Sequence, residues 1–250
     1  MQKVDVLDLE RRFEERLRSD PSGLSSTDVA DRVLEAAGGV HNLSVLDAGC
    51  GTGELCRRLA DRGARMSGID LCPGLLARAR SLAPDAALAR ADAHALPFSA
   101  ARFDLATSVL VLHYLEDPGR ALAELARVVR PGGRLVVCDR ICSADPVLRA
   151  AQLGVERLRN PLIHRILSSE ELEHLLEAAG FEIDHHVEFR RSEMVEAWVA
   201  GTDPRRAVAV REEISRLQGR DLGGFRVAPG DCIELRLALM DCRRIPAESK

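Results

Sequence analysis

The sequence contains no uninterrupted run of about 20 apolar residues, which is the length that a membrane-spanning helix needs. Its first ten residues lack the basic-then-apolar order of a secretory signal. No CxxC pair occurs among the seven cysteines, and no second pair of Cys or His completes a zinc set. We therefore expect a cytoplasmic protein with no membrane span, reduced thiols and no metal site.

Lysine is also scarce, since only Lys3 and Lys250 occur among 35 basic residues. Arginine carries the remaining positive charge, and its planar guanidinium suits two-point contact with carboxylates as well as simple solvation of a surface. The formal net charge is −4 and no basic block interrupts the mixed charges, so long-range attraction to a phosphate backbone is weak. We expect no nucleic-acid partner.

Short apolar runs alternate with helix-like segments along the chain. The predicted strands of the first half lie at 45–49, 66–70, 86–91, 103–112 and 134–139. The almost wholly apolar run 103–112 is typical of a strand that is buried on both faces of a parallel sheet. Two later strands are predicted at 181–189 and 232–242. This alternation predicts an α/β fold, with a doubly wound, mostly parallel sheet and helices on both faces.

Capping residues predict where two helices of the sheet region begin and end. Asp117 can cap a helix that Pro131-Gly132-Gly133 then ends. Ser168 and Glu171 have the spacing of a capping box, and Gly180 stops the helix that they begin.

The remaining segments are expected to cover the sheet. We interpret 1–250 as one domain, with capping helices at 1–40 and a cofactor-binding core at 41–140. The segments 141–167 and 190–230 are predicted to form a helical lid over the substrate, because most of the second one has a helical pattern and is too long for a hairpin turn.

A glycine-rich turn follows the first predicted strand, with glycine at 49, 51 and 53. Glycine lets the backbone approach a ligand closely, and a helix that starts at Glu54 points its first amides toward the turn. Such a turn at the carboxyl edge of a parallel sheet suits a nucleotide-like cofactor. The dinucleotide fingerprint GxGxxG would need glycine at position 54, so an NAD-dependent oxidoreductase is the alternative rather than the first choice.

The stretch VLDAGCGTGEL, from Val45 to Leu55, resembles the first motif of the class I, Rossmann-like SAM-dependent methyltransferases. Later motifs follow at that family's usual intervals, so the resemblance covers about 45 to 140. It is nearest to the small-molecule branch that includes the quinone-biosynthesis, type 11 methyltransferases. The resemblance implies a seven-stranded sheet whose last strand is antiparallel, and S-adenosyl-L-methionine (SAM) as the cofactor.

The resemblance also implies cofactor contacts at the first two strands. In the turn they are Asp47, Gly49, Cys50, Gly51, Thr52 and Gly53. Asp70, at the end of the second strand, would hold the ribose hydroxyls, with Leu71 against the adenine. A carboxylate that accepts from two vicinal hydroxyls is sound chemistry without the resemblance.

Two further loops complete the implied cofactor site. Asp92 would accept from the adenine amino group and the Ala93 amide would meet a ring nitrogen, while Ser108 and Val109 would lie beside the sulfonium. The loop after the fourth strand reads Leu-His-Tyr-Leu at 112–115 and lacks the Asn/Asp-Pro-Pro-Tyr/Phe motif of amide and nucleobase methyltransferases. Amide and nucleobase nitrogens are therefore disfavoured as acceptors.

Methyl transfer from a sulfonium is an in-line displacement, so the protein mainly aligns donor and acceptor. A hydroxyl or acidic carbon acceptor would gain from a general base, and the candidates at the strand ends are His113, Tyr114 and Asp139, with His113 as first choice. As structural alternatives, His113 would shape the substrate pocket, Tyr114 would form its wall, and Asp139 would cap a loop or pair with Arg140.

The sequence thus predicts an enzyme that transfers a methyl group to an oxygen or carbon of a small-molecule acceptor. The alternatives are the NAD-dependent oxidoreductase and a SAM-binding protein with a non-methylating role such as cyclisation. We expect an apolar acceptor, aromatic or not, because the lid segments bring few fixed charges and many apolar side chains. These are Leu153, Leu158, Leu162, Ile163, Ile166, Leu167 and Trp198. Both a monomer and a homodimer are compatible with the sequence.

Overall fold

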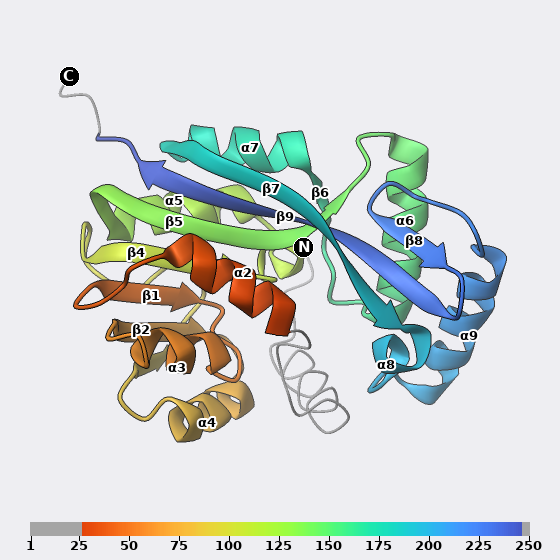
Figure 1. The fold of residues 1–250 in the computed structure, drawn as a ribbon, viewed down its shortest axis with the longest axis horizontal. Coiled ribbons are helices and arrows are strands. Elements are labelled where there is room, and N and C mark those ends of the chain that lie inside the picture. Colours follow the sequence, from red (N-terminus) through yellow and green to blue (C-terminus); the bar gives the residue numbers. More distant parts are fainter. Residues whose placement is uncertain (1–26, 247–250) are drawn as a thin grey trace.

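The computed structural model describes residues 27–246, which form one twisted mixed sheet with helices on both faces (Figure 1). The strand order is β3-β2-β1-β4-β5-β9-β7, and β9 runs antiparallel to both of its neighbours. These strands are β1 Ser44–Ala48, β2 Arg65–Asp70, β3 Ala87–Arg90, β4 Phe103–Val109, β5 Val129–Cys142, β7 Phe181–Met194 and β9 Cys232–Arg244. The predicted doubly wound, mostly parallel, seven-stranded sheet is confirmed, and two short strands extend it, β6 Leu167–Ser168 beside β5 and β8 Phe225–Ala228 beside β9.

Two layers of helices sandwich the sheet, and a third group lies beyond the strand ends (Figure 1). One face carries α2 Thr27–Ala37, α3 Glu54–Ala60 and α4 Pro73–Leu82. The other face carries α5 Pro118–Val128 and α7 Ser169–Ala178. The third group consists of α6 Pro146–Arg159, α8 Val195–Val199 and α9 Pro204–Arg216, in which α6 and α8 both pack against α9.

The central strands are apolar on both sides because each side faces a layer of helices. Along β5, Val136 belongs to the core beneath α2 and α3, whereas Val137 belongs to the core beneath α5 and α7. The same alternation separates Val45 from Leu46 in β1. Successive side chains of a strand point to opposite faces, so a continuous apolar run is the expected sequence of a strand that both layers cover.

Both predicted helix starts are confirmed. The Asp117 side chain accepts a hydrogen bond from the backbone N–H of Arg120 at 3.0 Å, which caps α5. At α7 the Ser168 hydroxyl accepts from the N–H of Glu171 at 3.2 Å, and the Glu171 carboxylate accepts from the N–H of Ser168 at 2.8 Å. These bonds satisfy backbone donors that a helix start leaves without an intrahelical partner.

Several boundaries differ from the predictions because tertiary pairing sets them. β4 ends at Val109 rather than 112, since Leu110 adopts a φ of 57° and turns the chain into a 3-10 turn, η1 Leu112–Tyr114. β5 starts before the predicted stop at 131–133, and β7 continues to Met194 because β9 pairs with it along its whole length. The helical stretch predicted after 192 is therefore two helices, α8 and α9. The first predicted capping helix lies outside the described residues.

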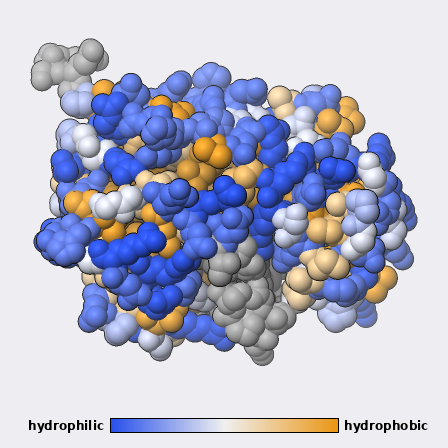
Figure 2. Space-filling view, in the orientation of Figure 1, coloured by the Kyte–Doolittle hydropathy of each residue, from blue (hydrophilic) through white to orange (hydrophobic). Residues whose placement is uncertain are grey.

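The exterior is mainly polar on the face that Figure 2 shows, with apolar side chains scattered among charged ones. Within 27–246, no helix is both long and apolar enough to cross a membrane. The same part of the chain holds no group of three or more His, Cys, Asp or Glu side chains arranged to bind a metal ion.

Candidate active site

The glycine-rich turn lies at the carboxyl end of β1, against the neighbouring strand β2. The backbone N–H groups of Gly49 and Cys50 both donate to the carbonyl oxygen of Ile69, at 2.8 and 2.9 Å. A Cβ atom at Gly49 would lie 2.3 Å from the Val111 side chain, so only glycine fits there. Gly51 has a φ of +55°, and no atom lies within 4 Å of the position that its Cβ would take. The turn is thus packed on one side and open on the other.

Asp70 ties the end of β2 to this turn. Its Oδ2 accepts from the backbone N–H of Gly51 at 3.0 Å, and its Oδ1 accepts from the N–H of Cys72 at 2.8 Å. Burial raises the pKa of the Asp70 carboxyl above its usual value, although these backbone hydrogen bonds oppose the rise. Each carboxylate oxygen keeps acceptor capacity beyond the one bond that it makes to the backbone.

Asp47 points into the protein rather than toward the open side of the turn. Its Oδ1 accepts from the Thr107 hydroxyl at 2.7 Å, and its Oδ2 accepts from the Cys56 thiol at 3.7 Å. Burial raises the pKa of Asp47 to about 6. These contacts join β1 to β4 and α3, so Asp47 holds the base of the turn while the rest of the predicted motif forms the turn itself.

The loop after β3 lies beside Asp70, because the N–H of Ala91 donates to the Asp70 carbonyl oxygen at 3.2 Å. In this loop Asp92 Oδ1 accepts from the His94 backbone N–H at 2.9 Å and lies 2.7 Å from His94 Nδ1. The Asp92 side chain is 51% exposed, whereas Ala93 is buried. Leu71 is half-buried next to this loop, and its carbonyl oxygen accepts from the Arg90 side chain at 3.1 Å.

Ser108 and Val109 are both buried at the carboxyl end of β4. The turn at Leu110 follows them directly and leads into η1, which carries His113 and Tyr114. Since β4 pairs with β1, the predicted sulfonium end of the cofactor site and the predicted base lie at the same edge of the sheet as the glycine turn. Segments that are far apart along the chain therefore meet at this edge of the sheet.

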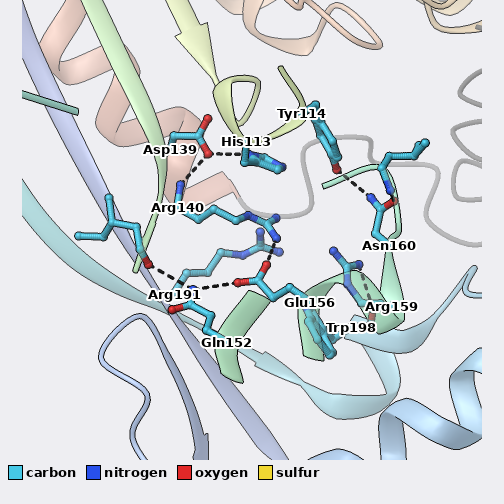
Figure 3. Close-up of polar contacts among 12 residues, drawn as sticks. His113, Tyr114, Asp139, Arg140, Gln152, Glu156, Arg159, Asn160, Arg191 and Trp198 are labelled. Atoms are coloured by element: carbon cyan, nitrogen blue, oxygen red, sulfur yellow. Dashed lines mark hydrogen bonds and ion pairs between the residues drawn. The ribbon is translucent and has the colours of Figure 1, made fainter. Parts of the chain in front are cut away.

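His113 and Asp139 form a buried hydrogen-bonded pair (Figure 3). His113 Nδ1 lies 2.6 Å from Asp139 Oδ1. The carboxylate also accepts from the backbone N–H groups of Leu112 and Arg140, each at 2.7 Å. The buried Asp139 carboxylate thus accepts from three donors, of which two are backbone N–H groups and one is the His113 ring.

The electrostatics of the pair leave His113 neutral. Burial lowers the pKa of His113, and the opposing attraction of Asp139 only partly compensates. Burial alone would raise the pKa of Asp139, but its contacts with His113 and Arg140 lower that pKa overall. An ionised Asp139 holds the ring proton on Nδ1, so the Nε2 atom of His113 carries the lone pair. This Nε2 is buried and has no hydrogen-bond partner among the described residues.

Tyr114 packs beside His113, with ring centroids 4.0 Å apart. Its hydroxyl accepts from Asn160 Nδ2 at 3.1 Å, and the His113 carbonyl oxygen accepts from the His164 N–H at 2.9 Å. Both contacts join η1 to the segment after α6, and Figure 3 shows the one between Tyr114 and Asn160. The predicted lid segment 141–167 thus touches the predicted base.

The lid side of this site is more charged than the sequence led us to expect. Arg140 forms an ion pair with Glu156 of α6, in which both side chains are almost fully buried. Gln152 Nε2 donates to Glu156 at 2.9 Å, and the Arg159 guanidinium lies 4.7 Å from the centroid of the Trp198 ring. The expectation of few fixed charges in the lid is therefore wrong. The spacing 152, 156, 159 on one face of an amphipathic helix is the sequence signal that could have revealed it.

The chain is similar to known proteins in sequence and in fold. Residues 46–137 match the protein family described as "Methyltransferase domain". Over 143 residues the chain is 38% identical to the malonyl-[acyl-carrier protein] O-methyltransferase of Pseudescherichia vulneris, covering 57% of this chain and 56% of that protein. Over 107 residues it is 38% identical to the demethylmenaquinone methyltransferase of Renibacterium salmoninarum, covering 43% and 45%. The matches span about half the length of the first curated relatives.

Among solved structures, the YcgJ protein of Bacillus subtilis superimposes with a TM-score of 0.79 at 20% identity, covering 89% of this chain and 100% of that one. This likeness extends the common fold beyond the matched family region. The fold and the order of the motifs define a class I, Rossmann-like methyltransferase domain. Residues 46–137 of this chain belong to that methyltransferase family.

Proposed function

We propose that the protein is an enzyme that transfers a methyl group from SAM to an oxygen or carbon of a small-molecule acceptor. The observation that supports it best is a juxtaposition at one edge of the sheet. The carboxyl ends of β1 and β2 bring the glycine turn and Asp70 together, and the end of β4 adds the buried pair of His113 and Asp139. Ligands of open α/β sheets bind at this edge.

The residues present fit SAM. No atom lies within 4 Å of the position of a Cβ at Gly51, so there is room for the cofactor beside the turn. The Asp70 carboxylate keeps acceptor positions for two ribose hydroxyls. The exposed Asp92 carboxylate is the acceptor for an adenine amino group. The other proposed contacts are Gly49, Cys50, Thr52, Gly53, Leu71, Ala93, Ser108 and Val109.

When bound, SAM supplies a methyl group on a sulfonium, which is activated without help from the protein. The chain's own contribution is to hold the acceptor in line, exclude water and remove a proton. Neutral His113 is the proposed general base, because its Nε2 lone pair is buried and unpartnered. Asp139 keeps the ring oriented and stabilises the imidazolium that forms, while Tyr114 forms a wall of the acceptor site.

We further propose that the segments 141–167 and 190–230 cover the acceptor and set its identity. The contacts of Asn160 and His164 with η1 support this role, since they connect the lid to the proposed base. In this interpretation, the core at 41–140 binds the cofactor and the two lid segments bind the acceptor within one domain.

Calorimetric titration with SAM and with NADH tests the proposal. We expect micromolar binding of SAM and none of NADH. Asp70→Ala should weaken SAM binding by roughly 10²-fold, since two hydrogen bonds to a charged group are lost. Asp85→Ala is the matched control, because Asp85 is exposed before β3 and away from the turn. Failure of SAM to bind at millimolar concentration, with NADH bound instead, would favour the oxidoreductase.

A further inference from the structure

Buried polar atoms without a protein partner gather beside the proposed base. Among the residues of 27–246 they include His113 Nε2, Arg140 Nε, Gln152 Oε1 and Trp198 Nε1. All four side chains belong to the cluster in Figure 3, which brings together η1, β5, α6 and α8. Leaving a buried donor or acceptor unpaired is costly, so a concentration of such atoms at one place indicates that a polar ligand completes them.

Arg140 presents a free edge in this cluster. Its Nη1 donates to the buried Glu156 carboxylate, whereas its Nε is buried without a partner and no hydrogen bond is formed by Nη2 to any described residue. Nε and Nη2 form one side of the planar guanidinium, with two parallel donors. Glu156 therefore fixes one side of the guanidinium and leaves the other side for a group with oxygen acceptors.

The unpartnered atoms of His113 and Arg140 lie in the same part of the cluster. Arg140 directly follows Asp139, which is hydrogen-bonded to His113, and the Arg140 guanidinium lies near the His113 ring (Figure 3). The charge of Arg140 is close enough to His113 to contribute to the lowered pKa of the imidazole. A ligand at His113 Nε2 is thus within the electrostatic reach of the Arg140 guanidinium.

From this geometry we propose that His113 and Arg140 form a two-point site for a neutral acceptor. The acceptor is an enol or a phenol whose hydroxyl is conjugated with a neighbouring carbonyl group. The inference rests on the proposed function and names its acceptor class. The hydroxyl meets His113 Nε2, and the carbonyl oxygen accepts from the free edge of Arg140. Donation to the carbonyl draws charge from the hydroxyl and makes its proton easier to remove.

The charges of the cluster favour a neutral acceptor over a carboxylate. Glu156 already compensates Arg140, and Asp139 is ionised beside a neutral His113. A free carboxylate would enter next to two buried negative charges, which is unfavourable at low dielectric. A neutral hydroxyl instead delivers its proton to His113 and creates an imidazolium that Asp139 stabilises.

The step balances in atoms and charge. The acceptor's O–H bond breaks and its proton goes to His113 Nε2, while the oxygen forms a bond to the methyl carbon. The S–C bond breaks with its electron pair kept by sulfur, which leaves S-adenosylhomocysteine (SAH) and a methyl ether. The imidazolium then releases the proton to water.

The test compares two probes, 2-hydroxyacetophenone and 2-ethylphenol, in which the carbonyl group of the first is replaced by CH₂ in the second. Calorimetry measures the binding of each to the SAH-loaded protein. We expect the wild type to bind the hydroxyketone about 10-fold or more tightly than 2-ethylphenol. Arg140→Lys keeps the charge opposite Glu156 but loses the planar pair of donors, so it should reduce this ratio to near one. Arg216→Lys, at an exposed ion pair with Glu213, should leave the ratio unchanged.

Equal binding of the two probes to the wild type would overturn the inference, because water would then be the only partner of the free edge. An Arg140→Lys effect of equal size on both probes would do the same, and tighter binding of 2-hydroxybenzoate than of the ketone would refute the neutral class. If Arg140→Lys does not fold, the double variant Arg140→Gln, Glu156→Gln removes both charges together and takes its place. Loss of SAH binding would instead contradict the proposed function, and the probe ratio measured without SAH still decides the inference.

Discussion

Replacing Asp139 by asparagine would change one oxygen to an NH₂ group at a site where the carboxylate accepts from three N–H donors. With the amide oxygen toward Leu112, the NH₂ group faces His113 Nδ1, which forces the ring proton onto Nε2 and removes the lone pair from the acceptor side. With the amide oxygen toward His113, the NH₂ group opposes the Leu112 N–H and the imidazolium loses its counter-charge. Both orientations therefore remove general-base catalysis.

We expect kcat for a hydroxyl acceptor to fall about 10²- to 10⁴-fold in Asp139→Asn, which corresponds to about 3–5 kcal/mol of activation free energy. The Kd of SAH should change less than about twofold, because Asp139 does not contact the glycine turn or Asp70. In the wild type, kcat/KM should rise with pH through the lowered pKa of His113 and be level by neutral pH, since only the neutral ring accepts a proton.

Steady-state kinetics over pH 4.5–8.5 with one acceptor, together with calorimetry of SAH, measure these quantities. Asp85→Asn serves as the control for loss of an exposed carboxylate. A kcat for Asp139→Asn within threefold of the wild type, with the same pH profile, would refute a catalytic role for the pair and leave His113 as a packing residue.

Three further predictions follow from buried charges. Because burial raises the pKa of Asp47 to about 6, the native state binds a proton there more readily than the unfolded chain does, and stability is lost as pH rises from about 4 to about 6. The free energy of unfolding of Asp47→Asn, measured in urea, should therefore rise relative to that of the wild type by up to about 3 kcal/mol between pH 4 and pH 8. The pKa of Asp70 is also raised by burial, so the carboxylate takes up a proton at a higher pH than an ordinary aspartate does. As the pH is lowered, calorimetry should show that the affinity for SAM begins to fall at this higher pH. Glu156→Gln leaves Arg140 as an unpaired buried charge and should cost about 3–5 kcal/mol of unfolding free energy in urea, whereas Glu182→Gln, at an exposed pair with Arg243, should cost less than about 1 kcal/mol.

The parallel core could be predicted because its signals are local. Each central strand is an apolar run, the glycine turn carries its own backbone requirement, and Asp117 and Ser168 cap the helices that follow them. The proposed cofactor contacts lie in the same short motifs, and the parallel pairing of β1 with β2 and β4 brings those motifs to one edge of the sheet.

The surroundings of the proposed acceptor site could not be predicted in the same way, because their geometry depends on long-range contacts. Nothing in the local sequence marks Leu110 as the residue with a φ of 57° that turns η1 toward the site. The extension of β7 to Met194 requires its partner β9, which lies about 40 residues further on. Arg140 and Glu156 each suit a solvated surface, and only the packing of α6 against β5 makes them a buried pair.

The pairing of β7 with β9 has a consequence for how the proposed second lid segment can vary. The last register pair is Met194 with Cys232, so the intervening residues 195–231 leave the sheet and return to it at one point. A segment anchored in this way can change in length or sequence without shifting the register of the strands, and longer loops cost little additional closure entropy. Replacement of this whole segment would therefore leave the strands of the proposed cofactor-binding core in place.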